Sequence, residues 1–154
     1  IKPSPNLPNG KAINLYPSLC LFEGTNVSVG RGTEMQFQIF GSPLIKEEKF
    51  SYTFTPKPNI GSKSPKHKGK VCYGLNLERS EYLNEINLEW LISAYKSSEK
   101  KSEFFNSFFT KLAGQKILQK QIENGFNAEE IKKSWKLDLK NFKKLRSKYT
   151  LYKD

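Results

Sequence analysis

The chain has 154 residues, enough for one domain with a hydrophobic core that its 11 Phe, 7 Tyr and 2 Trp would largely fill. No apolar run approaches the roughly 20 residues that a membrane-spanning helix needs, which argues against a membrane span. The net charge of +11 raises the question of a nucleic-acid partner, but only three of the 26 basic residues are Arg, the residue that base and phosphate recognition favours, so we expect none.

The basic excess is concentrated in residues 96–154, which hold 15 basic and 7 acidic residues. Its lysines are spread over helical polar positions, so we interpret the excess as a solvated surface. Attraction to an anionic polymer stays open as an alternative.

The chain begins with a segment, residues 1–18, that is rich in Pro and Asn and contains no initiating Met. We expect it to be an interdomain linker that leads into a single α+β domain over residues 19–154, so that the chain is a fragment of a longer protein. The apolar residues 19–22 are predicted to form a short buried strand. That strand would open into the polar, glycine-rich segment 23–33, and such junctions are common places for binding sites.

Three more strands are expected in the first half of the chain. Apolar and polar side chains alternate over residues 36–39 and again over 50–54, and residues 71–77 also resemble a strand. Pro and Gly residues end the first two of these segments. Residues 57–70 are nearly free of apolar side chains and are predicted to form a loop.

Beyond residue 87 the apolar period becomes that of a helix. Amphipathic helices are expected over residues 88–95, 104–112 and 117–122, followed by a long helix to residue 145, and their aromatic stripes are interpreted as core. The predicted end signals are Asn87 as a cap, Gly114 and Gly125 as C-terminal glycines, and a capping box of Asn127 and Glu130.

Strands first and helices second predict an α+β fold, with a small mixed β-sheet from the N-terminal half packed against a helical C-terminal half. Cys20 and Cys72 fit no metal or redox spacing, and the chain has a single His, so we expect no metal site. We expect the two cysteines to lie near each other as buried thiols, with a disulfide in an oxidising compartment as the alternative.

The segment 23–33, EGTNVSVGRGT, holds the candidate site residues. It matches neither glycine-rich nucleotide-binding pattern, so no cofactor is expected. Glu23 is a candidate general acid or base for glycoside hydrolysis, or else it accepts N–H bonds from its own loop. His67 lies in a Lys-rich loop and is expected to be exposed rather than catalytic.

Several long segments resemble one bacterial family. They include LYPSLCLFEGTNVSVGRGT (15–33), FQIFGSP (37–43), FTPKPNIGSKSPKHKGKVCYGLNL (54–77) and IENGFNAEEIKKSW (122–135). The chain is similar over nearly its whole length to NamZ-type exo-β-N-acetylmuramidases, formerly a domain of unknown function. Residues 43–54 form a shorter connection than in many relatives, so a helix found there in others is expected to be absent.

The resemblance implies hydrolytic release of N-acetylmuramic acid from the non-reducing end of peptidoglycan fragments, and so an extracytoplasmic, periplasmic setting. It also implies a Rossmann-like N-terminal domain, with the active site in the cleft between the two halves and at least one catalytic carboxylate in the other half. This chain would be the C-terminal domain of such a two-domain enzyme and would form one wall of the cleft. Its expected substrate-binding residues are Glu23, Thr25, Asn26, Ser28, Arg31 and Thr33. The alternative is a non-catalytic module that binds carbohydrate or polyanions through Lys-rich loops.

Arg31 has two competing interpretations in this setting. N-acetylmuramic acid carries one carboxylate on a lactyl ether, and the planar fork of an Arg suits such a group better than a Lys does. The flanking glycines would let the backbone approach the sugar, while Thr25 and Asn26 would read its hydroxyl and acetamido groups. Alternatively, Arg31 pairs with Glu23 across the loop and holds its shape.

Overall fold

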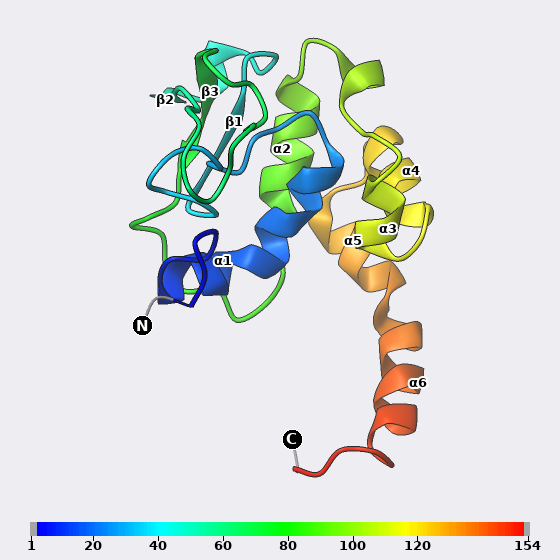
Figure 1. Ribbon diagram of the computed structural model, residues 1–154. Helices are drawn as coiled ribbons and strands as arrows, with labels where there is room; N and C mark the ends of the chain where they lie inside the picture. The colour runs from blue at the N-terminus through cyan, green and yellow to red at the C-terminus, as the bar shows by residue number, and fades with distance from the viewer. Residues whose placement is uncertain (1–2, 153–154) are drawn as a thin grey trace.

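A computed structural model describes residues 3–152, apart from the side chain of Glu47, and shows a small sheet beside a group of helices (Figure 1). The strands are β1 (Ile39–Ser42), β2 (Tyr52–Phe54) and β3 (Cys72–Asn76). The α-helices are α1 (Gly10–Leu19), α2 (Glu89–Ser97), α3 (Phe109–Ala113), α4 (Ile117–Glu123), α5 (Ala128–Ser134) and α6 (Lys136–Arg146). Short 3₁₀ turns are η1 (Cys20–Gly24), η2 (Glu47–Lys49) and η3 (Lys101–Glu103).

Helix α1 was not predicted, because its residues belong to the segment interpreted as a linker. The helix begins where the Asn9 side chain accepts the Ala12 N–H at 2.9 Å, and it contains Pro17 near its end. Its apolar residues Ala12, Leu15 and Leu19 are fully buried. Their spacing of three and four residues is the helical signal that the surrounding Pro and Asn residues obscured.

The strand predicted over residues 19–22 is also wrong. Leu19 ends α1, and the chain continues as the 3₁₀ turn η1, which keeps Leu21 and Phe22 buried. An apolar run of only four residues has no periodicity that separates a strand from a buried helical turn. The helical segment therefore extends up to the polar segment 23–33.

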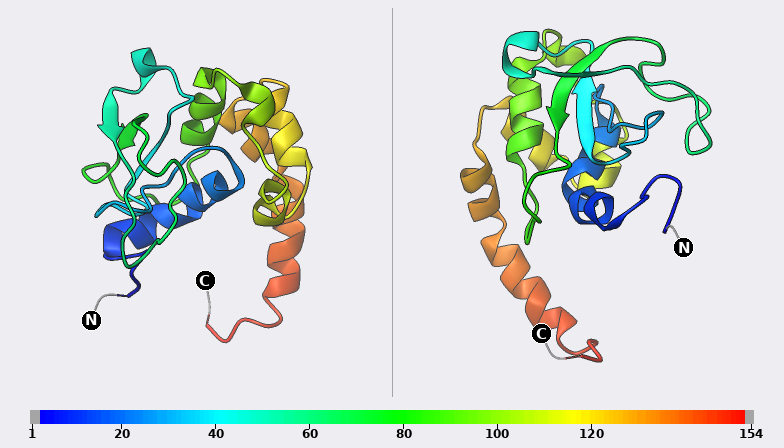
Figure 2. Two further views of the ribbon diagram at one scale, coloured as in Figure 1. Left: turned by 45° about the horizontal axis from the view of Figure 1, so that its top comes forward. Right: turned by 90° about the vertical axis from the view of Figure 1, so that its left-hand side faces the viewer.

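The sheet confirms the α+β class, and its pairing is antiparallel rather than mixed. β3 lies between β1 and β2 and pairs with both, with Gly41 opposite Gly74 and Thr53 opposite Tyr73. Helix α2 lies between this sheet and the helices α3 to α5, while α1 runs beneath them (Figures 1 and 2).

The predicted helix end signals are confirmed at three places. Gly114 and Gly125 follow α3 and α4 with positive φ angles of 75° and 84°. Asn127 and Glu130 form the complete capping box of α5. The fourth signal lies close to its expected place, because the Asn87 side chain accepts the Glu89 N–H at 2.9 Å where α2 begins. Caps depend on residues next to one another in the sequence, so the sequence predicts them well.

The helix predicted over residues 104–112 exists only from Phe109 onward. Phe104 and Phe105 precede it, and Phe105 forms an isolated antiparallel bridge with Thr25. Phe104 and Phe109 are fully buried, as the core interpretation of the aromatic stripe requires. The core also contains the stacked rings of Phe22 and Phe40, whose centroids are 4.7 Å apart.

The long C-terminal helix divides at Trp135 into α5 and α6. Helix α5 buries Ala128 and Ile131, whereas no residue of α6 is buried. Helix α6 extends away from the body of the domain (Figure 2). Its apolar side chains are half exposed or more, and they are Leu137, Leu139, Phe142 and Leu145.

Because α2 is buried and α6 is exposed, the same Leu→Ala substitution should lower the free energy of unfolding by different amounts in the two helices. Leu91→Ala in α2, where the side chain is 1% exposed, should lower the free energy of unfolding by about 2–5 kcal/mol. Leu139→Ala in α6, where the side chain is 50% exposed, should cost about 1 kcal/mol or less. Urea unfolding of both variants of this chain measures the difference, and equal losses would show that α6 packs as firmly as α2.

Candidate functional site

The backbone of loop 23–33 is fixed at both of its sides. On one side, the Asn26 N–H donates to the Phe104 carbonyl at 2.8 Å. On the other side, Ser28 and Gly41 exchange two backbone hydrogen bonds of 2.8 and 2.9 Å, which join the loop to β1. The loop therefore joins the sheet to the segment in front of α3, and it is held like a strand rather than free like a surface loop.

Three hydroxyl groups of the predicted site hold the shape of the loop. Thr25 Oγ1 donates to the Phe22 carbonyl at 2.8 Å and accepts the Val27 N–H at 3.0 Å. The hydroxyls of Ser28 and Thr33 make similar bonds to backbone groups two or three residues away. Thr25 and Ser28 are also almost completely buried.

The glycines on both sides of Arg31 meet protein atoms and leave no space for a sugar. Gly30 and Gly32 have φ angles of 77° and 81°, where side chains other than glycine are strained. A Cβ on Gly30 would lie 2.6 Å from the Ile39 side chain, and one on Gly32 would lie 2.6 Å from the Lys57 carbonyl. The expectation that these glycines let the backbone approach a ligand is therefore replaced by a role in the turn itself.

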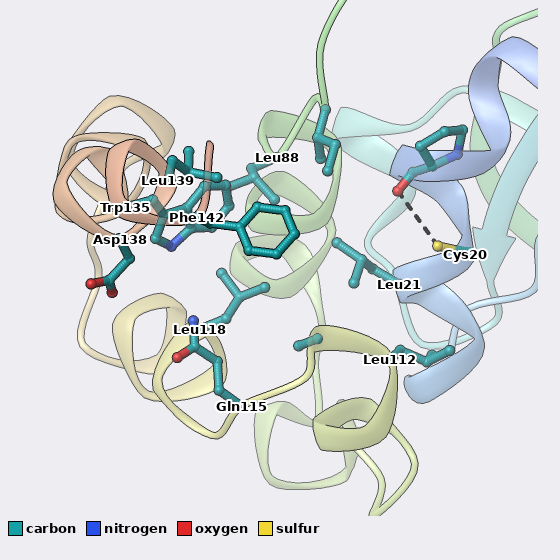
Figure 3. Close-up of a pocket in the computed structure, with 13 residues that line it drawn as sticks. Cys20, Leu21, Leu88, Leu112, Gln115, Leu118, Trp135, Asp138, Leu139 and Phe142 are labelled. Carbon is teal, nitrogen blue, oxygen red and sulfur yellow. Dashed lines mark hydrogen bonds between the residues drawn. The ribbon is translucent and has the colours of Figure 1, made fainter. Parts of the chain in front are cut away.

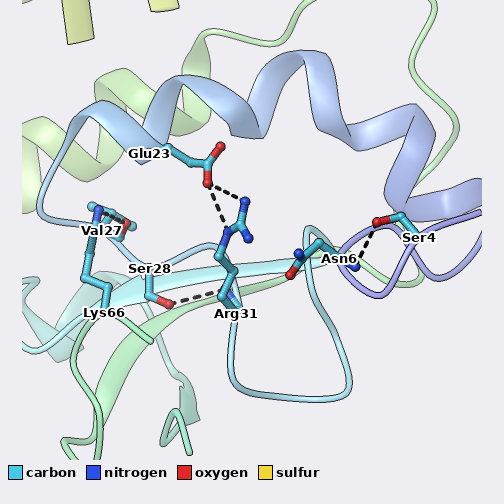
Figure 4. A network of polar contacts seen from close by, with 8 residues as sticks. Ser4, Asn6, Glu23, Val27, Ser28, Arg31 and Lys66 are labelled. Carbon is cyan, nitrogen blue, oxygen red and sulfur yellow. Dashed lines mark hydrogen bonds and ion pairs between the residues drawn. The ribbon is translucent and has the colours of Figure 1, made fainter. Parts of the chain in front are cut away.

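Glu23 and Arg31 form an ion pair across the loop (Figure 4). Arg31 donates from Nε at 3.0 Å and from Nη2 at 2.8 Å, both to Oε1 of Glu23. Within residues 3–152, Oε2 of Glu23 has no hydrogen-bond partner. The two side chains are 24% and 34% exposed, so the pair is accessible from solvent. This is the arrangement that the second interpretation of Arg31 requires.

Lys66 and His67 reach the same loop from the segment 57–70. The Lys66 ammonium donates to the Thr25 carbonyl and to the Val27 carbonyl, the latter at 3.1 Å. His67 Nε2 contacts the carbonyl between them, that of Asn26. Because a carbonyl oxygen only accepts, Nε2 must carry the proton in this contact. Two adjacent side chains thus hold three consecutive carbonyls.

Burial changes the acid–base behaviour of both side chains. It lowers the pKa of Lys66 to about 8, while the charge of Glu23 acts to raise that pKa and the charge of Arg31 to lower it. Burial also lowers the pKa of His67. The expectation that His67 is simply exposed is wrong, since the side chain is half-buried against loop 23–33.

Asn26 has no partner for its side-chain amide. Both the amide nitrogen and the amide oxygen are buried, and neither makes a hydrogen bond within the described part of the chain. Leaving a buried polar atom unpaired costs about 1–3 kcal/mol, so folded proteins rarely do it. Asn26 therefore lies at the centre of the clamped segment with unused hydrogen-bonding capacity.

The two cysteines are free thiols, so the alternative of a disulfide is not formed here. Cys72 is fully buried and burial raises its pKa to about 12, while Cys20 is partly exposed and donates to the Pro17 carbonyl at 3.5 Å. Residues 3–152 contain no cluster of His, Cys, Asp and Glu that could hold a metal ion.

In the same residues, no helix has both the length and the apolar character for crossing a membrane.

An apolar groove of about 390 Å³ separates α6 from the body of the domain (Figure 3). We call it the α6 groove. The indole nitrogen of Trp135, which lines it, is buried without a hydrogen-bond partner in the part of the chain described. Its other apolar lining includes Leu21, Leu112, Leu118, Leu139 and Phe142.

Comparison with known proteins identifies relatives over almost the whole chain. Residues 14–152 match the family model for the C-terminal region of exo-β-N-acetylmuramidase NamZ. A peptidoglycan β-N-acetylmuramidase NamZ from Bacillus subtilis (strain 168) is 33% identical over 166 residues. That alignment covers 99% of this chain and 40% of the relative.

Two solved structures of DUF1343 family proteins from Bacteroides fragilis NCTC 9343 are also similar. The first is 48% identical with a TM-score of 0.91, and the match covers 100% of this chain and 44% of that protein. The second is 19% identical with a TM-score of 0.68, covers 99% and 45% respectively, and shows a similar fold. The chain thus spans less than half the length of each of these relatives.

The bonds of Thr25 predict that its hydroxyl matters for stability. Thr25→Val keeps the shape of the side chain but leaves the buried Val27 N–H without a partner and removes one of the two hydrogen bonds to the Phe22 carbonyl, which still accepts the backbone N–H of residue 25. This should cost about 1–3 kcal/mol of unfolding free energy. Thr53→Val, at an exposed position of β2, is the matched control and should change stability by about 0.5 kcal/mol or less. Equal effects in a urea titration would contradict the assigned role.

Proposed function

The chain belongs to the family of NamZ C-terminal domains, and we propose that it forms one wall of a cleft in which a longer enzyme binds terminal N-acetylmuramic acid of peptidoglycan. The assignment is supported by the match over residues 14–152 and by the 33% identity to a peptidoglycan β-N-acetylmuramidase. The proposed setting, as for the substrate itself, is outside the cytoplasm.

The observation that carries this proposal is the accessible ion pair of Glu23 and Arg31 on a rigid loop. A glycosidase holds its carboxylates in a fixed position beside the scissile bond. Arg31 fixes Oε1 of Glu23, and Oε2 is left for a ligand. We therefore assign Glu23 as the candidate catalytic residue and Arg31 as the residue that positions it.

The other predicted site residues take different parts in this proposal. Thr25, Ser28 and Thr33 do not contact the substrate in this proposal. Their hydroxyl groups hold the loop in the shape that positions the residues that do. Asn26 has an unpaired amide, which suits the hydroxyl and acetamido groups of the sugar. One wall nevertheless supplies one carboxylate, and glycoside hydrolysis generally uses two.

The second carboxylate would come from an N-terminal, Rossmann-like domain of the same protein. The relatives are more than twice as long as this chain, so most of their sequence lies outside the shared region. The α6 groove supports such a partner, because an apolar surface of this kind is normally covered. We propose that the N-terminal domain packs into this groove and that α6 attaches the two halves to each other.

We expect the isolated chain of 154 residues to fold and to release no N-acetylmuramic acid from peptidoglycan fragments. A single wall neither excludes water from the sugar nor provides both carboxylates. The assay compares the isolated chain with the full-length protein by quantifying the sugar that is released. Efficient release by the isolated chain would place the complete site within these residues and contradict the proposal.

In the full-length protein, Glu23→Gln should lower kcat by about 10²–10⁴-fold, because the amide can neither give nor take the proton. Glu34→Gln, a change of the same charge at an exposed position near the loop, should leave kcat unchanged. The melting temperatures of both variants are compared with that of the parent. Unchanged activity in Glu23→Gln, or loss of its fold, would show that Glu23 only supports the loop.

A further inference from the structure

The charges around loop 23–33 do not balance. Arg31 is neutralised by its ion pair with Glu23, whereas the Lys66 ammonium bonds only to the uncharged carbonyls of Thr25 and Val27. An ammonium group has three N–H donors, and these two bonds use two of them. Lys66 therefore retains one donor and an uncompensated positive charge beside the ion pair.

We propose that Lys66 is a specificity-determining residue of this site, and that its ammonium group binds the carboxylate of a carboxylate-bearing sugar. This inference rests on the proposed function, because it takes the sugar to be N-acetylmuramic acid. It replaces the sequence-based expectation that Arg31 holds the lactyl carboxylate.

The geometry favours Lys66 over Arg31 for this role. To hold the lactyl carboxylate with its fork, Arg31 would first have to leave Glu23, and Glu23 would then lose the contacts that orient it. Lys66 does not have to give up any contact, since two carbonyls fix its Nζ and the third N–H remains available to a ligand. A bound carboxylate would also supply the negative charge that a half-buried ammonium lacks.

The Asn26 amide provides a second, independent observation. Lys66 and His67 hold the backbone at and around Asn26, yet its side-chain amide atoms are buried without partners in residues 3–152. An amide offers both donors and an acceptor, which is what the neutral groups of an N-acetylated sugar require. An unpaired amide on the segment that the Lys66 ammonium holds suits a ligand that is both amide-bearing and anionic.

The inference gives the affinity a defined pH dependence. The charged and titratable groups around Lys66 are Glu23 and Arg31 of the loop and the neighbouring His67. The charge of Lys70 in turn acts on His67. In the free domain the pKa of Lys66 is about 8, and a bound carboxylate raises it because it favours the charged form. Affinity for the anionic sugar is therefore complete below pH 8 and is lost as the pH rises through the higher pKa of the complex.

Nuclear magnetic resonance of the full-length protein, which contains both walls of the cleft, tests this directly by following the ¹³Cε signal of Lys66 as a function of pH. With saturating N-acetylmuramic acid we expect the pKa of Lys66 to rise by about 1, which corresponds to about tenfold tighter binding by the protonated form. N-acetylglucosamine, which lacks the lactyl carboxylate, should leave the pKa unchanged. Binding of N-acetylmuramic acid with no change in the Lys66 pKa overturns this inference and leaves the proposed function standing. Binding of neither sugar overturns both.

Lys66→Gln in the full-length protein provides the complementary test, with Lys68→Gln at an exposed position of the same segment as the matched control. We expect Lys66→Gln to raise KM for muramic-acid substrates about tenfold at pH 7 and to abolish the rise of KM between pH 7 and 9. Lys68→Gln should behave like the parent. Equal effects of the two variants overturn the inference, and if Lys66→Gln does not fold, the resonance experiment on the unsubstituted full-length protein decides.

Discussion

The contacts of Lys66 and His67 with the carbonyls of residues 25–27 are the constraint on which the rest of the site depends. They fix the middle of a segment that is already joined to β1 through Ser28 and to the residues before α3 through Asn26. A loop fixed at these points can present an ion pair in one orientation. We call these contacts of Lys66 and His67 the Lys66 clamp. Glu23 and Arg31 lie before and after the residues that it holds, so their ion pair has one fixed orientation. Burying the ammonium group opposes its charged form and so costs stability, and the two charge-assisted hydrogen bonds offset part of that cost.

Features that depend on neighbouring residues could be predicted from the sequence. The capping box of Asn127 and Glu130, the glycines after α3 and α4, and the strands β2 and β3 belong to this class. The alternation over residues 36–39 did not locate β1, which begins only at Ile39 and continues through Gly41 and Ser42, the residues expected to end it. Features that depend on contacts between residues distant in the sequence could not be predicted in this way. Helix α1 contains Pro17 and follows a Pro-rich segment, which obscured the helical spacing of its apolar residues until their burial against the core was seen.

The candidate site shows the same division. Its specific motif identified loop 23–33, because that string is unusual in composition. The Lys-rich segment 57–70 gave no such signal, since an exposed Lys and one that binds carbonyls look alike in sequence. Lys66 and His67 are distinguished only by the fold, which brings them against a loop about 40 residues earlier in the chain. The glycines beside Arg31 were assigned to ligand approach for the same reason, since the atoms that they contact belong to distant segments.

Hydrogen exchange of the loop amides tests most directly the claim that the Lys66 clamp shapes the site. In Lys66→Gln, we expect the amides of Asn26 and Ser28 to exchange at least about tenfold faster than in the parent, with the core amides of α2 unchanged. Lys68→Gln should leave both sets unchanged. Unaltered protection of the loop in Lys66→Gln, or equal loss of protection throughout the domain, would show that Lys66 does not shape the site.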